Sequence, residues 1–148
     1  LDHGADHLAR VQHLESIVHV HPVELMENWR DGRIKLFAIQ RLLAVRRRHP
    51  DLFSHGSYTG IPAHGTFAAK VVAFERRTES QSVLVIVPRH TAALGFPPTG
   101  SVWEETHLPL PTQSPGWRDL FTGREHTEEK LSLAEVFADL PFAVLEVM

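Results

Sequence analysis

The spacing of apolar residues changes once along this chain of 148 residues, close to Phe53. Before Phe53 they recur every three or four positions, as in amphipathic helices. After it, two β-branched runs at residues 66–77 and 82–88 flank the polar segment 78–81, which predicts an antiparallel hairpin. Because helices come first and strands follow, we expect an α+β chain rather than alternating β-α-β units.

The strand-rich part predicts an antiparallel sheet or sandwich. Gly and Pro residues separate its apolar runs, as expected for short strands joined by turns. Further short strands are expected at residues 101–110, 117–121, 131–133 and 142–148, with a one-turn helix at 133–140. The predicted organisation is a helical segment, residues 1–53, packed on a C-terminal β-sandwich domain, residues 54–148.

Three helices are expected before Phe53, at residues 6–18, 21–29 and about 31–48. Pro22 suits a first helical turn, where its missing N–H costs nothing. Asp31 can accept hydrogen bonds from the free N–H groups that begin the long helix. The three arginines 46–48 suit its carbonyl end, and Pro50 prevents its continuation.

The long helix is apolar on two sides. Ile34, Ala38, Leu42 and Val45 form one stripe, whereas Leu36, Ile39 and Leu43 form another. A single partner surface cannot cover both stripes. The helix is therefore either a core helix of this chain alone or a helix that lies between the β-domain and something the chain lacks.

Composition indicates an ordinary globular protein, with 43% apolar and 22% charged residues. A net charge of −3 gives no general attraction to nucleic acid or membranes, so arginines 46–48 are interpreted as a helix-end cluster.

The longest apolar run, residues 83–87, is too short to span a bilayer. The absence of cysteine suits the cytoplasm. Because the chain starts with Leu1 and ends abruptly, we interpret it as a piece of a longer protein.

Motifs for catalysis are missing from the sequence. It has no Gly-rich phosphate loop, no Gly-x-Ser-x-Gly elbow and no cysteine-based metal site. Glu104 and Glu105 are adjacent in a predicted strand and would point to opposite faces. Glu128 and Glu129 are predicted to lie in a solvated turn. No catalytic residue is predicted in the chain itself.

Histidine is abundant, with 11 residues, but its spacing does not define a metal site. His3 and His7 are four residues apart, and His19 and His21 flank Val20. No third ligand follows at a diagnostic distance, so these side chains are predicted to be surface or capping histidines. We predict no metal and no cofactor.

Aromatic residues offer one alternative, a platform on which a sugar ring could stack. Trp29, Tyr58, Trp103 and Trp117 are scattered along the chain, and such residues more often lie in a core. Trp103 and Trp117 are the possible sugar-stacking residues of an autonomous carbohydrate-binding module, which is the alternative function. A second alternative, a basic-helix interaction module, would use arginines 46–48.

Taken in order, several segments resemble the C-terminal region of maltooligosyl trehalose synthase, of glycoside hydrolase family 13 in the α-amylase superfamily. The more specific ones are DGRIKLFAIQRLLAVRRRHP and LAEVFADLPFAVL; the others are GSYTGIPAHG, KVVAFERR, VLVIVPRH, SVWEETHLPLP and WRDLFTG. The resemblance implies an isomerase that converts the reducing-end α-1,4 bond of a maltooligosaccharide into an α,α-1,1 bond. The catalytic carboxylates of that family belong to a (β/α)₈ barrel and to motifs that this sequence lacks.

The resemblance implies a non-catalytic portion that stabilises the barrel and meets maltooligosaccharide only through it. The long helix would be the last barrel helix, beginning at the catalytic face. Its first residues, Asp31, Gly32, Arg33 and Lys35, would then lie nearest the substrate, although capping and surface solvation are the simpler explanation of these residues. Without the barrel, Leu36, Ile39 and Leu43 would be exposed or covered by the N-terminal helices or a second copy.

Overall fold

A computed structural model describes residues 22–110 and 116–148. The chain divides into two compact units, Leu1–Arg47 and Arg48–Met148, and each is described by itself. The first predicted helix and the histidines at positions 3, 7, 19 and 21 lie outside the described residues. Within the described ranges, no helix is long and apolar enough to cross a membrane.

The first unit contains helix α2 (Pro22–Glu27), the 3₁₀ helix η1 (Trp29–Asp31) and helix α3 (Arg33–Arg48), whose last residue begins the second unit. Pro22 opens α2 as predicted. The long helix starts at Arg33, two residues later than expected, because Gly32 adopts a left-handed conformation (φ 82°) after η1. The prediction of its end at Arg48 is confirmed.

Helix α3 buries fewer apolar residues than its composition suggests. Ile34, Phe37 and Val45 are buried, and Leu36 is half-buried. Leu42, expected in the same stripe as Ile34 and Val45, is 42% exposed. Three large apolar side chains of one helix thus face solvent: Ile39, Leu42 and Leu43.

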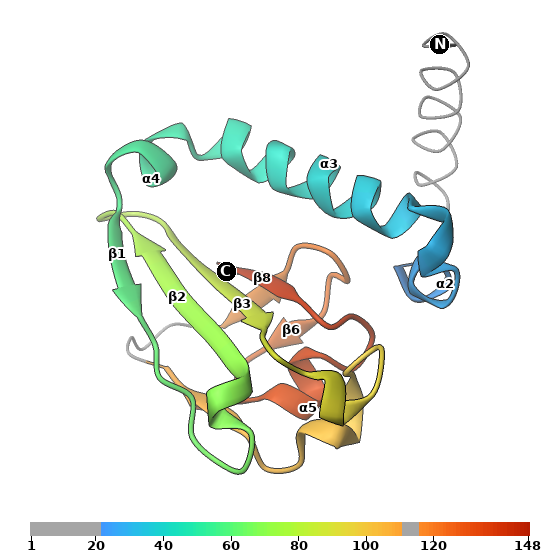
Figure 1. Cartoon of the computed structure of the whole chain (residues 1–148). Helices are drawn as coiled ribbons and strands as arrows, with labels where there is room; N and C mark the ends of the chain where they lie inside the picture. The colour runs from blue at the N-terminus through green and yellow to red at the C-terminus, as the bar shows by residue number, and fades with distance from the viewer. Residues whose placement is uncertain (1–21, 111–115) are drawn as a thin grey trace, which may run out of the picture. The chain divides into compact units, whose positions relative to one another are not determined.

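The second unit is organised around a six-stranded antiparallel sheet of order β1-β2-β3-β8-β5-β6 (Figure 1). Each ladder within it is antiparallel, with Arg77 opposite Ser82 at the β2–β3 turn and Val85 opposite Val144 between β3 and β8. The predicted hairpin is confirmed. The strands are β1 (Ser57–Gly60), β2 (Val71–Arg77), β3 (Ser82–Pro88), β5 (Trp117–Asp119), β6 (Glu125–His126) and β8 (Ala143–Val147).

A second sheet pairs only β4 (His107–Pro109) with β7 (Lys130–Ser132). Short helices connect the strands: α4 (Pro50–His55), α5 (Leu133–Val136), η2 (Ala68–Lys70), η3 (Ala92–Leu94) and η4 (Gly100–Trp103). The chain is therefore α+β with an antiparallel sheet domain. The sandwich and the barrel remnant stay predictions.

One local prediction was wrong, and two others were confirmed in a modified form. Residues 101–110 do not form one strand, because η4 occupies their start and Glu104 has φ 51°, a value incompatible with a strand. The one-turn helix predicted within residues 133–140 is confirmed as the four residues of α5. Pro50 does end α3, with His49 outside the helical region, but it also opens α4, where its fixed φ suits the first turn.

The core of the second unit lies between the sheet and the segment that contains α5 and η4. In β2, buried Val71, Ala73 and Glu75 alternate with more exposed neighbours, as expected for a strand with one buried face. The buried Glu75 carboxylate accepts a hydrogen bond of 2.6 Å from the Ser82 hydroxyl. The large apolar side chains of this core come from segments far apart in the sequence: Trp103, Leu108, Trp117, Leu131 and Phe137.

Arg76 attaches the end of α4 to the sheet. Its Nη2 atom donates to the carbonyl oxygens of Leu52, Phe53 and Gly56 at 3.1–3.3 Å. These carbonyls lie at the negative end of the helix, where a positive charge is favourable. The Leu52 carbonyl also accepts the Gly56 backbone N–H at 3.0 Å, so the guanidinium adds a second donor there and supplies one to the carbonyls of Phe53 and Gly56.

Replacing Arg76 with alanine is expected to lower the free energy of unfolding by about 2 kcal/mol, because three carbonyls lose a charged donor. Urea denaturation followed by circular dichroism would measure the loss. Arg89→Ala is the matched control, since Arg89 is exposed and no hydrogen bond of its side chain is described. Equal stability of the two variants would contradict a role for Arg76 in holding α4.

Candidate functional site

The predicted substrate-proximal residues form a helix cap. The Asp31 carboxylate accepts hydrogen bonds from the backbone N–H and from Nε of Arg33, both at 2.9 Å. Gly32 between them supplies the left-handed turn. Lys35 is exposed and takes no part in this arrangement. The structure thus brings together three of the four residues, and the capping interpretation of Asp31 agrees with these contacts.

The two candidate sugar-stacking tryptophans are buried. Trp103 is 0% exposed, packs against Phe137 with ring centroids 5.1 Å apart, and donates Nε1 to the Pro98 carbonyl at 2.7 Å. Trp117 is also buried. Neither ring presents a face on which a sugar could stack without displacing core side chains. The exposure expected for a carbohydrate platform at these two positions was therefore wrong.

Glu105 caps a loop rather than facing a substrate. Its Oε1 atom accepts hydrogen bonds from the backbone N–H and hydroxyl of Thr66. These hydrogen bonds to the charged form, the hydroxyl first, hold the pKa of Glu105 below its usual value. Its carboxylate is already engaged, which makes it a poor proton donor near neutral pH.

Asp119 is a buried carboxyl group at the end of β5. Its Oδ1 atom accepts hydrogen bonds from the backbone N–H groups of Phe121 (2.8 Å) and Thr122 (3.2 Å), closing a tight turn. Burial outweighs these hydrogen bonds and raises the pKa of Asp119 to about 6. A carboxyl group that titrates near neutral pH is often functional, but here its acceptor atom is committed to the turn.

A polar recess in the second unit has a volume of about 360 Å³ and is lined by residues 48, 49, 80–83, 146 and 147. His49 Nε2 lies 2.9 Å from Glu146 Oε2, and Arg48 Nη2 lies 3.6 Å from the same oxygen. The single carboxylate of this recess is therefore paired with two basic side chains.

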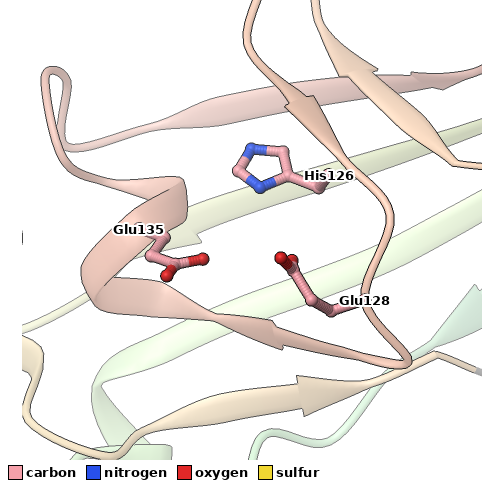
Figure 2. A group of neighbouring side chains, drawn as sticks. All are labelled: His126, Glu128 and Glu135. Atoms are coloured by element: carbon pink, nitrogen blue, oxygen red, sulfur yellow. The ribbon is translucent and has the colours of Figure 1, made fainter.

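The most concentrated group of potential ligands comprises His126, Glu128 and Glu135. One ring nitrogen of His126 and one oxygen from each glutamate lie within 4.8 Å of one another. Figure 2 shows the two carboxylates pointing toward each other below the imidazole ring. His126 belongs to β6, Glu128 follows in the connection to β7, and Glu135 belongs to α5. The sheet and the short helix thus bring three metal-binding groups together.

Sequence reasoning missed this cluster. Glu128 is exposed in a turn as predicted, but its proximity to Glu135 depends on the turn back through β7. The available signal was the His-x-Glu spacing at positions 126 and 128, with Glu135 seven residues after Glu128. The periodicity of a single helix or strand does not predict that these three side chains come together.

The described residues define an α+β chain with an antiparallel sheet domain. No protein-family model matches the chain. It is 39% identical over 111 residues to a protein named "Putative maltooligosyl trehalose synthase" from Mycobacterium tuberculosis strain CDC 1551 / Oshkosh, and equally to its counterpart in strain H37Rv. The aligned part is 75% of this chain and 13% of each relative.

The chain therefore spans only a small fraction of the length of these relatives. At the level of the family, the similarity supports the resemblance to maltooligosyl trehalose synthase that the sequence motifs carry. The chain is related to one part of these proteins.

Proposed function

We propose that this chain is a non-catalytic, C-terminal portion of a maltooligosyl trehalose synthase of glycoside hydrolase family 13. The parent enzyme would be an isomerase of trehalose biosynthesis, converting the reducing-end α-1,4 bond of a maltooligosaccharide to α,α-1,1. The observation that carries the proposal is the 39% identity over three quarters of this chain but only 13% of the relatives. A segment this short relative to its relatives leaves ample length elsewhere for a catalytic domain.

The distribution of carboxylates supports a non-catalytic role. Retaining glycosidase chemistry needs a nucleophile and an acid/base about 5 Å apart that flank the scissile bond. Among the described residues, Glu128 and Glu135 approach that separation, but both side chains are exposed. The recess of about 360 Å³ and a more apolar one of about 560 Å³ beside residues 60–73 are lined by other residues. Neither glutamate would flank a bound sugar chain there.

The exposed face of α3 supports the role of a stabilising segment. Ile39, Leu42 and Leu43 are each more than 40% exposed. Three large apolar side chains on one helix are unfavourable in water unless a partner covers them. In the proposed parent protein that partner is the catalytic barrel, and α3 is its last helix. Asp31, Gly32, Arg33 and Lys35 would then lie at the edge of the barrel that carries the substrate, and a cytoplasmic location would suit this enzyme.

The purified chain is expected to give neither binding heat nor a trehalose-capped product with maltopentaose. Isothermal titration and an assay for non-reducing product would be run on the same preparation. Product formation would contradict the non-catalytic role. Saturable heat without turnover would instead favour the carbohydrate-binding module, although the burial of Trp103 and Trp117 leaves that alternative without its expected platform.

A complementary experiment removes the homologous 111-residue segment from the Mycobacterium tuberculosis relative. If that segment stabilises a catalytic domain, the shortened protein should lose most of its soluble yield or thermal stability. Co-expression with the present chain should restore part of the loss. A triple variant with Ile39, Leu42 and Leu43 changed to serine tests the exposed face of α3 in the same assay. Full stability of the shortened relative would overturn the proposed role.

A further inference from the structure

The imidazole of His126 is a buried polar group that lacks a partner in the described part of the chain. The residue is 4% exposed, and its Nε2 atom forms no hydrogen bond there. Leaving a buried polar atom unsatisfied is unfavourable. The unpartnered Nε2 shows that, among the described residues, no hydrogen bond holds the ring at that atom, and the potential ligand atom is the other ring nitrogen.

Figure 2 shows that the other ring nitrogen of His126 faces the carboxylates of Glu128 and Glu135. The potential ligand atoms of the three side chains lie within 4.8 Å of one another. Within the described ranges, neither carboxylate forms an ion pair with a basic side chain. Two negative groups therefore converge on a neutral nitrogen without a neutralising charge between them.

Arg124, the nearby cation, is occupied elsewhere. Its Nη1 atom donates to the backbone carbonyl of Glu135 at 3.2 Å, and its Nη2 atom lies 3.8 Å from Asp139. Burial, followed by the charge of Arg124, lowers the pKa of His126, while Glu128 and Glu135 raise it. The net effect is a lowered pKa of His126.

We propose that His126, Glu128 and Glu135 form a binding site for a divalent transition metal of the Zn²⁺ type. One imidazole nitrogen and two carboxylate oxygens match the ligands that Zn²⁺ accepts, whereas Mg²⁺ and Ca²⁺ prefer oxygen alone. Zn²⁺ with ligands at about 2.0–2.2 Å needs them roughly 3.4 Å apart. The ligand atoms lie at most 4.8 Å apart, and the two glutamates are exposed, so rotation of their side chains can bring the oxygens closer.

Such an ion would join β6, the connection to β7 and α5. Three protein ligands also leave a fourth position for water. The site depends only on residues of the second unit and is independent of the proposed role in trehalose synthesis.

The test is isothermal titration of the full chain with Zn²⁺ at pH 7.5, together with thermal unfolding. We expect a single site with a dissociation constant below about 10 μM and a rise in Tm on adding Zn²⁺. Glu128→Gln and Glu135→Gln should each weaken binding at least tenfold, because each removes one anionic ligand. Co²⁺ provides a second readout, since its visible absorption reports the ligand geometry.

The matched control is Glu129→Gln, an exposed neighbour outside the cluster that should leave Zn²⁺ affinity unchanged. The chain has 11 histidines, so binding elsewhere must be distinguished. Unchanged affinity in the double variant Glu128→Gln/Glu135→Gln would assign the ion to other histidines and overturn the proposal. The proposal also fails if the unmodified chain binds Zn²⁺ no more tightly than about 1 mM. Because both glutamates are exposed, these variants should fold even if a substitution at His126 does not.

Discussion

Replacing Trp103 with alanine should lower the free energy of unfolding by about 3–5 kcal/mol, the range for removing a large aromatic side chain from a core. The indole is fully buried against Phe137, so truncation would leave a cavity. It would also remove the N–H that donates to the Pro98 carbonyl and leave a buried acceptor without its partner. Both losses act in the same direction.

Urea denaturation monitored by far-ultraviolet circular dichroism would measure this change. Trp29→Ala is the matched control, since Trp29 is 42% exposed and its described contact is a cation–π interaction with Arg30 at 5.2 Å. We expect it to cost less than about 1 kcal/mol. A loss below about 1 kcal/mol for Trp103→Ala would contradict its place in the core and reopen a surface role for its indole.

The stability of the chain should fall as pH rises through about 6 because of Asp119. Its pKa is about 6 in the folded chain and near 3.8 when unfolded, so the folded state binds more protons between these values. The protonated side chain therefore stabilises the fold below pH 3.8, and this contribution is lost above pH 6. The difference between these two pKa values corresponds to a change of at most about 3 kcal/mol in the free energy of unfolding.

Asp119→Asn should remove most of this dependence. The asparagine oxygen can still accept the hydrogen bonds from Phe121 and Thr122, but the side chain cannot ionise. At pH 8 the variant should be about 2–3 kcal/mol more stable than the unmodified chain, with the difference shrinking toward pH 4. Glu79→Gln, in an exposed turn, is the control. If Asp119→Asn is less stable at pH 8, the hydrogen bonds to the ionised carboxylate outweigh its burial.

Local sequence patterns predicted the features that depend on neighbouring residues. The β2–β3 hairpin follows from two β-branched runs around a short polar turn. Pro22 and Pro50 mark helix ends through their backbone, and Asp31 does so through its carboxylate. Antiparallel pairing followed from the absence of long helices between strands. These signals lie within a few residues of the structure that they specify.

Features that depend on distant segments were not predictable in this way. Glu105 lies in a turn because η4 tightens the chain before it, and it meets Thr66 from 39 residues away. His126 and Glu135 meet only after the chain has formed β7 and entered α5. The burial of Trp103 likewise depends on Phe137, far along the sequence. The surroundings of these side chains are set by the packing of segments far apart in the sequence, which local sequence patterns do not predict.

The position of β8 between β3 and β5 has a consequence for the order of folding during synthesis. Strands β1, β2 and β3 can pair as they leave the ribosome, and β5 can pair with β6. The two groups cannot join until residues 143–147 emerge, because β8 alone is paired with both β3 and β5. Until then the apolar edge of β3 stays open to other chains. Such late, non-local pairing slows folding, so a chaperone bound during that interval would protect the nascent sheet.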